Sequence, residues 1–440
     1  MQIPPSKRFW KRLAIGVGLV VGALLVVNGA LAWRAERRLQ HQVEVIRAQG
    51  EPASIAELAP QPIPEDKNAA AFLRKITPRI EAFADDQGKF YNTPIGKAYD
   101  EAGDRGELPN AEQIAAIRTI MDKYPDVAEG VAAAAACDQY ASRLDFSLNQ
   151  QKFIQALVDQ QSDVRQAARF LNWKMELDLA DGNVEGAMEH GLQMLRLGRL
   201  YDNEPSMISF LIGVAVRGIA TESLYDALTA GKVSEATHEA LDAELVRHDR
   251  PERLRRAIVT ERAMGAGWFD AVVDENDNRL FLPRLFGWPL KNYQAECLMM
   301  MNEQLKLAER PWHELNKQFE SGISPETPSG YGVLADLLMP AIRASFQANA
   351  RGIALLRSLR IYNALRHFAE KNGREATGLA ELNLPVEATI DPYSGQALKL
   401  KHTKDGWTVY TVMENGVDDG GDFKELKDFG LAPRKLRLTE

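Results

Sequence analysis

The chain has 440 residues, of which 45% are hydrophobic, and a net charge of −8 at pH 7. This is enough for a substantial buried core and for two or three structural units beyond any tail. Lysine and arginine are scattered rather than gathered on one face, which argues against a nucleic-acid partner. The two cysteines, Cys137 and Cys297, form no Cys-x-x-Cys motif, so neither a zinc ribbon nor a thioredoxin-type site is predicted. A disulfide between them stays open if the body lies outside the cytoplasm.

Residues 13–33 contain no charged side chain. A helix of this length rises about 31 Å, enough to cross a hydrocarbon core of about 30 Å. Four basic residues within residues 1–12 precede it, which favours a cytoplasmic N-terminal tail and a body on the other side. The sequence therefore predicts a single-pass protein of a bacterial inner membrane with its body in the periplasm.

A cleaved signal peptide is the alternative, because Ala30-Leu-Ala32 has the small-x-small form of a cleavage site. Arg34, Arg37 and Arg38 stand just after this site, and positive charge there is unfavourable for export. Both interpretations place the body outside the cytoplasm.

Small residues recur every fourth position within the apolar segment, at Ala14, Gly18 and Gly22. Such a flat helix side lets a second helix approach closely, so a homodimer through these residues is a hypothesis.

Residues 34–67 follow as a predicted stalk. The pattern of residues 34–47 is helical and polar, and residues 51–64 contain four prolines, which prevent a continuous helix and favour an extended linker.

A helical domain is predicted for residues 68–340. Asn110 is an expected N-cap, with Gln113 three positions later completing a capping box. Residues 88–107 are predicted to form a loop. Apolar spacing and breakers predict helices over residues 68–83, 110–121, 162–179, 184–200, 207–228, 251–268 and 293–309.

The connection from Leu179 to Ala187 resembles the turn of a tetratricopeptide repeat, with Gly182 and Ala187 at the positions that let two helices close on each other. One hairpin does not make an array, and a plain helical hairpin explains the pattern equally well.

The character of the sequence changes in residues 341–440. A long helix over residues 341–372 is expected to end at Gly373, because glycine favours the left-handed C-cap conformation. After the turn Asp391-Pro-Tyr-Ser-Gly395, alternating residues flank Lys404-Asp405-Gly406, which predicts a β-hairpin. The acidic, glycine-rich stretch of residues 415–422 follows.

This order of long helix, Asp-Pro turn, hairpin and acidic loop resembles the globular domain of the major pseudopilins of type II secretion, over about residues 355–422. The resemblance implies a calcium ion bound in the loop by Asn415, Asp418, Asp419 and Asp422. Calcium prefers six to eight oxygen ligands, which such a loop offers. The apolar span lies far upstream of the matching helix, unlike in a pseudopilin, so no fibre-forming role is expected.

The whole chain also resembles a family of bacterial membrane-anchored helical proteins with the same plan, over residues 167–228 and 356–422. This resemblance implies an architecture and no activity.

No catalytic motif is recognisable. His313-Glu314 begins a zincin-like pattern, but Lys317 occupies the place of the second histidine. The acidic run of residues 274–278 lacks the glycine of an EF-hand loop. Helical carboxylates such as Glu176, Asp178 and Glu261 remain candidates for an acid pair.

The sequence therefore predicts a mainly α protein: a transmembrane helix, an irregular helical-hairpin body and a small C-terminal α+β module. The preferred function is a membrane-anchored periplasmic scaffold or adaptor that binds another envelope protein. The alternatives are a hydrolase with carboxylates in a helical cleft and an accessory component of a secretion-like system.

Overall fold

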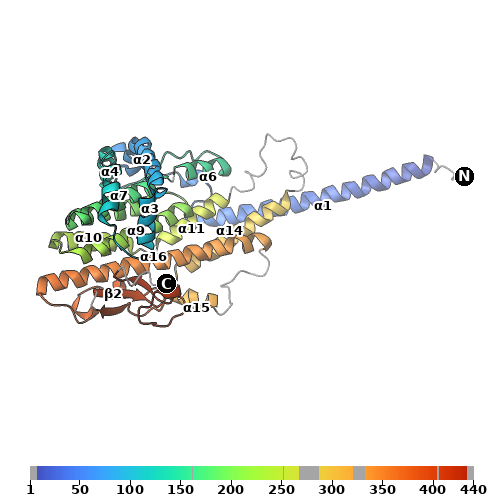
Figure 1. Cartoon of the computed structure of the whole chain (residues 1–440). Helices are drawn as coiled ribbons and strands as arrows, with labels where there is room; N and C mark the ends of the chain where they lie inside the picture. Colours follow the sequence, from blue (N-terminus) through green and yellow to red (C-terminus); the bar gives the residue numbers. More distant parts are fainter. Residues whose placement is uncertain are drawn as a thin grey trace.

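A computed structural model describes residues 7–160, 162–250, 252–266, 287–320, 332–403 and 406–433. In this part of the chain the protein is mainly helical, with one small antiparallel sheet near the C-terminus (Figure 1). The helices are α1 (Lys7–Ala48), α2 (Ala69–Tyr91), α3 (Pro94–Asp104), α4 (Ala111–Met121), α5 (Pro125–Ala135), α6 (Gln150–Asp159), α7 (Ser162–Ala180), α8 (Val184–Tyr201), α9 (Met207–Ala230), α10 (Glu235–His248), α11 (Glu252–Gly265), α14 (Trp288–Ala308), α15 (Trp312–Glu320) and α16 (Gly332–Asn372). The strands are β1 (Lys399–Thr403), β2 (Gly406–Thr411) and β3 (Phe429–Leu431).

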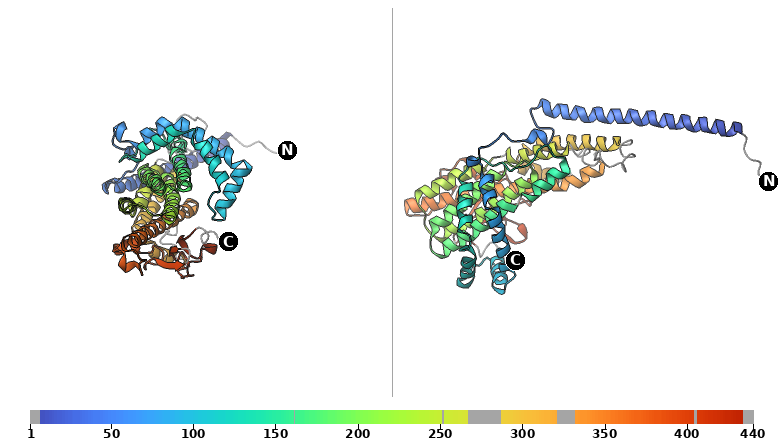
Figure 2. Two further views of the ribbon diagram at one scale, coloured as in Figure 1. Left: turned by 60° about the vertical axis from the view of Figure 1, so that its left-hand side comes forward. Right: turned by 90° about the horizontal axis from the view of Figure 1, so that it is seen from above.

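Helix α1 projects from the body as a long rod (Figures 1 and 2). Its apolar part is exposed, whereas Leu39 and Ile46 in its second part are buried in a small core with Ala295 and Leu298 of α14. Among the described helices, α1 and α9 are long and apolar enough to cross a membrane. Because α9 is half buried and packs against α7, α8 and α16, it is a core helix.

The predicted stalk needs a correction. Residues 34–47 are helical as predicted, but they continue α1 and dock on α14, so they do not form a separate stalk. The first part of the proline-containing segment that follows, residues 51–58, is not a free extended linker either. Ala53 and Ile55 are buried, and Glu51 pairs with Arg255 and Arg262 of α11. Burial of these apolar side chains together with ion pairing holds the segment on the body.

Helices α7, α8 and α9, which match three of the predicted helices, pack together in the main core. They approach closely at Gly191, where an added Cβ would lie 2.4 Å from Leu224 Cδ2 and 3.0 Å from Met175 Cε. The turn between α7 and α8 has Gly182 at φ +75°, and Ala187 is fully buried. The predicted helical hairpin is therefore confirmed, while its tetratricopeptide-like character stays a prediction.

The prediction of a loop over residues 88–107 is wrong, because α3 occupies much of it. The Thr93 side chain accepts a hydrogen bond from the Gly96 amide, and Pro94 fills the first helical position. Both features favour helix initiation. The capping box of α4 is confirmed, since Asn110 and Gln113 each bind the other's backbone amide.

Helix α16 begins before the predicted residue 341 and contains Pro340. It ends as predicted at Gly373, which has φ +66°. The predicted hairpin is confirmed as β1 and β2, and β3 extends it to a sheet of order β1-β2-β3. Lys404 and Asp405 of the predicted turn lie outside the described residues, as do residues 274–278. The sheet packs on α16 and shares the main core through Leu398, Val409 and Leu431 (Figure 1).

Candidate functional site

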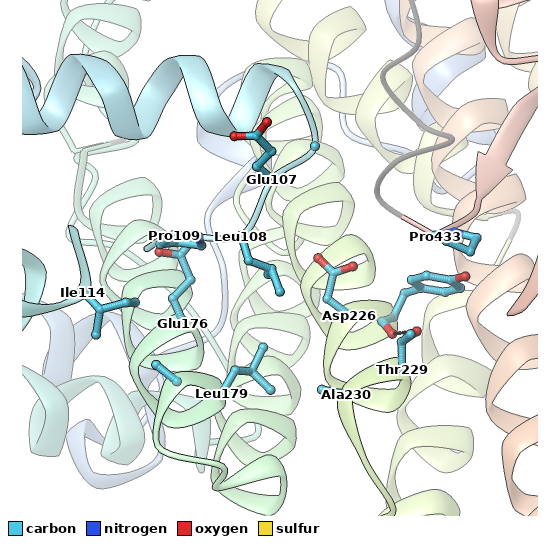
Figure 3. A pocket seen from close by; sticks show the side chains of 13 residues that line it. Glu107, Leu108, Pro109, Ile114, Glu176, Leu179, Asp226, Thr229, Ala230 and Pro433 are labelled. Carbon is cyan, nitrogen blue, oxygen red and sulfur yellow. Dashed lines mark hydrogen bonds between the residues drawn. The ribbon is translucent and has the colours of Figure 1, made fainter. Parts of the chain in front are cut away.

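A cavity of about 570 Å³ lies between the α3–α4 connection, α7 and α9, and we call it the acidic pocket (Figure 3). Most of its lining is apolar, and it carries three carboxylates. It is lined by Gly106, Glu107, Leu108, Pro109, Ile114, Glu176, Leu179, Ala180, Tyr225, Asp226, Thr229, Ala230 and Pro433.

The α3–α4 connection forms one wall because both helix ends are fixed. Gly106, at φ +66°, donates its amide to Gly103 O, and the Glu107 amide donates to Ala102 O. This pair of bonds is a Schellman motif, which ends α3 and turns the chain sharply. Three residues later the capping box begins α4. Leu108 is held between these two caps with its side chain 64% exposed.

The opposite wall comes from the C-terminal parts of α7 and α9. Leu179, Ala180 and Ala230 contribute apolar surface. Tyr225 is buried, and its hydroxyl donates to Trp407 O at 2.8 Å, which ties α9 to the first residues of β2. Pro433, shortly after β3, completes the rim, so elements far apart in the sequence meet at this cavity.

Two of the carboxylates have partners that favour the charged form. The Arg105 guanidinium holds the pKa of Glu107 below its usual range through a hydrogen bond and an ion pair at 3.1 Å. The Tyr99 hydroxyl donates to Glu176 at 3.0 Å. Burial, together with the charge of Glu176, raises the pKa of Tyr99, which therefore keeps its proton for this bond.

Asp226 lies on α9 across the pocket from Glu176 on α7. In Figure 3 the Glu176 and Asp226 side chains extend from their helices on either side of Leu108. The described lining contains no lysine, arginine or histidine, so the side chains of the lining bring negative charge only. Glu107, Glu176 and Asp226 each take part in further interactions within the chain.

The structure places the four predicted metal ligands in one loop, where their side chains make hydrogen bonds to other groups of the protein. Asp418 Oδ1 accepts from the Tyr410 hydroxyl at 2.9 Å and from the Gly420 amide at 3.1 Å. Asp419 Oδ2 accepts from Asn415 Nδ2 at 2.9 Å. Asp422 accepts from the Lys424 amide and lies 3.6 Å from Lys427 Nζ.

Within the described ranges, no three histidine, cysteine or acidic side chains are grouped as a metal site. Calcium binding would compete with the hydrogen bonds from Tyr410 to Asp418 and from Asn415 to Asp419. Calcium binding by Asn415, Asp418, Asp419 and Asp422 stays a prediction.

Asp391, the first residue of the Asp-Pro turn, has a structural role. It is buried, and its carboxylate accepts hydrogen bonds from the Tyr393 amide at 2.8 Å, Ser394 Oγ at 2.8 Å and Thr411 Oγ1 at 2.5 Å. A charged acceptor with several donors is well satisfied when buried. Asp391 therefore joins the Asp-Pro turn to the end of β2.

The three helical carboxylates that are candidates for an acid pair each bind a different partner. Glu176 bonds Tyr99 in the acidic pocket, and Asp178 lies 3.3 Å from His190. Glu261 is half-buried and accepts from the Met207 amide at 2.8 Å, at the N-terminus of α9, while desolvation raises its pKa. The cysteines Cys137 and Cys297 are not bonded to each other.

Sequence reasoning named Glu176 but missed Glu107, Leu108 and Asp226. The missed signal for the first two was local, since Thr93-Pro94 and Gly106 mark the start and end of α3. No local sequence signal indicates Asp226, because the apolar pattern of α9 does not show which distant residues pack beside the C-terminal end of this helix.

Comparison with protein-family models, curated proteins and solved structures found no match to this chain. The resemblances inferred from the sequence therefore stay predictions, and the function has to be argued from the chain itself.

Proposed function

We propose that this protein is a membrane-anchored scaffold or adaptor that holds its helical body at the outer face of a bacterial inner membrane and binds another envelope protein. The observation that carries the proposal is the division of α1. One continuous helix exposes its apolar part and buries its second part against α14. An exposed apolar stretch of this length is stable in a bilayer and costly in water.

Ion pairs strengthen the junction between anchor and body. Glu36 pairs with Lys291 of α14, and Arg38 Nη1 lies 3.0 Å from Glu296 Oε1. Glu51 adds its pairs with α11. A body fixed to the anchor in this way is held in one orientation, which suits a protein that presents a surface to a partner in the same membrane.

A hydrolase that uses the acidic pocket is the second candidate, because three carboxylates line one cavity. A general acid needs a raised pKa to hold a proton near neutral pH. The pKa of Glu107 is lowered instead, and the Tyr99 bond stabilises the charged form of Glu176. The lowered pKa makes Glu107 unsuited to hold a proton near neutral pH.

The test is purification of the full chain from solubilised membranes after chemical cross-linking, with identification of whatever is joined to it. We expect a membrane-derived partner cross-linked to the body, and retention of that partner when α1 is replaced by an unrelated span. Turnover in a broad hydrolase screen without a cross-linked partner would contradict the proposal.

A further inference from the structure

We propose that the body docks directly on the bilayer through a basic-aromatic cluster, formed by Trp33, Arg34 and Arg37 of α1 and Trp288 of α14, which binds the headgroups of anionic phospholipids. This inference rests on the membrane-anchoring part of the proposed function and adds the lipid that receives the body. It follows from the register of two helices, from the tryptophans that share one level and from the basic charge beside them.

Two ion pairs set the register of α1 and α14. Glu36 pairs with Lys291, and Arg38 Nη1 lies 3.0 Å from Glu296 Oε1. Residue numbers therefore rise in the same direction along the two helices, which lie side by side (Figures 1 and 2). The first residue of α14, Trp288, then lies about one helical turn nearer the N-terminus of α1 than Glu36 does. This is the level at which the uncharged segment of α1 ends.

Tryptophans from both helices lie at this level. Trp33 is the last residue of the uncharged segment, and its side chain is 62% exposed. Trp288 is half-buried. Tryptophan is enriched where membrane proteins pass from hydrocarbon to headgroups, because its ring is apolar and carries one polar group. A bilayer boundary at Trp33 therefore also meets the start of α14.

Basic charge accompanies the tryptophans. Arg34 and Arg37 are exposed, and neither forms an ion pair with the part of the chain that the structure describes. The Arg37 guanidinium lies 4.8 Å from the centre of the Trp33 ring. The nearby carboxylates of Glu36 and Glu296 are already paired across the two helices, so Arg34 and Arg37 are excess positive charge. Guanidinium groups bind phosphate through paired hydrogen bonds.

Position and charge favour a lipid over a protein as the ligand. The cluster begins where the uncharged segment ends, so the headgroups of the same bilayer meet it once α1 is inserted. The whole chain has a net charge of −8, which an anionic surface repels. A local positive excess therefore determines which end of the body approaches the membrane. Direct docking also agrees with the absence of a separate stalk in residues 34–47, which lie on α14.

The experiment photolabels the full chain in nanodiscs of phosphatidylcholine that contain phosphatidylglycerol with a diazirine in its headgroup. Mass spectrometry identifies the labelled peptides, and extraction at alkaline pH checks that the chain is inserted. We expect label on the peptide that contains Trp288 and none on α10, at the opposite end of the body (Figure 1). The Trp288 peptide is decisive because it is far in sequence from α1 and from the basic N-terminal tail.

A matched lipid and matched variants test the charge. Phosphatidylcholine with the same diazirine should label the Trp288 peptide about threefold less, and R34Q/R37Q should lower labelling by the anionic lipid by about the same factor. R165Q/R169Q removes two exposed arginines one turn apart on α7 and should leave the labelling unchanged. Added salt should reduce the difference between the two lipids, because it screens the guanidinium charges.

Three results would overturn the inference. An inserted chain with no more label on the Trp288 peptide than on α10 would place the body away from the bilayer. Equal labelling by the two lipids, or unchanged labelling of R34Q/R37Q, would show that anionic headgroups are not the ligand. Each of these results leaves the proposed function intact, because binding of an envelope protein needs no contact between α14 and lipid. A chain released by alkaline extraction would instead contradict the anchoring itself, and both proposals with it.

Discussion

The ion pair between Glu51 and Arg262 offers a direct test of how the anchor is joined to the body. The Arg262 side chain is 1% exposed, and besides Glu51 it donates to Asn302 Oδ1 at 2.7 Å. Burial opposes ionisation of Glu51, but hydrogen bonds from Arg262 and Arg255 still hold its pKa below the usual value. In the Glu51→Gln variant the guanidinium keeps its hydrogen bond to Asn302 but loses the charged partner.

Removing one member of a buried ion pair typically costs about 3–5 kcal/mol. Because Asn302 remains and the Glu51 side chain is 13% exposed, we place the loss for Glu51→Gln at about 3 kcal/mol, the lower end of that range. Arg262→Met removes the buried charge itself. The double variant E51Q/R262M should therefore be at least about 1 kcal/mol more stable than E51Q alone.

The assay is urea-induced unfolding of the full chain in detergent, followed by circular dichroism. Arg47→Gln is the matched control, since it breaks the exposed pair with Glu57 and should leave the stability nearly unchanged. If E51Q is no more destabilising than R47Q, or if the two single effects simply add in E51Q/R262M, the reasoning about this junction is refuted.

Three other predictions concern the core and the acidic loop. Burial lowers the pKa of His248 to about 4 although its ring lies 3.2 Å from Glu244. Below pH 6.5 the unfolded chain therefore binds a proton at His248 that the folded chain does not bind, so the stability should fall between pH 6.5 and 4. His248→Gln should flatten that part of the profile of urea midpoint against pH. Gly191→Ala should lower the stability by about 1–3 kcal/mol, because the added Cβ would collide with Leu224. Gly218→Ala, whose Cβ would have nothing within 4 Å, should stabilise α9 by about 0.5–1 kcal/mol. Equal effects of the two substitutions in urea denaturation would contradict the close packing of α7, α8 and α9. Millimolar calcium should raise the thermal midpoint of the native chain and not that of the D418A/D419A variant; an unchanged native midpoint would leave the loop as a hydrogen-bonded turn.

Elements with strong local signals could be predicted from the sequence. The capping box of Asn110 and Gln113 lies within one turn, so its partners are fixed by spacing alone. The same holds for Gly373 at the end of α16 and for the alternation that forms β1 and β2. In each case the interacting residues are close in sequence or follow one periodicity.

Features that depend on distant partners could not be predicted. The segment of residues 51–64 has the prolines of a free linker, yet it is held because Glu51 meets Arg255 and Arg262 on α11. Nothing near Glu51 in the sequence indicates those partners. The acidic pocket has the same origin, since its carboxylates become neighbours only when α7, α9 and the α3–α4 connection pack together.

The measurement that tests the central claim most directly is the location of the full chain in bacterial cells. Spheroplasts are treated with protease, and separately their membranes are extracted at alkaline pH. The account predicts that the chain stays in the extracted membranes and that its body is digested by protease added from outside. A chain recovered in the soluble cytosolic fraction, or a membrane-bound chain whose body the external protease leaves intact, would contradict it.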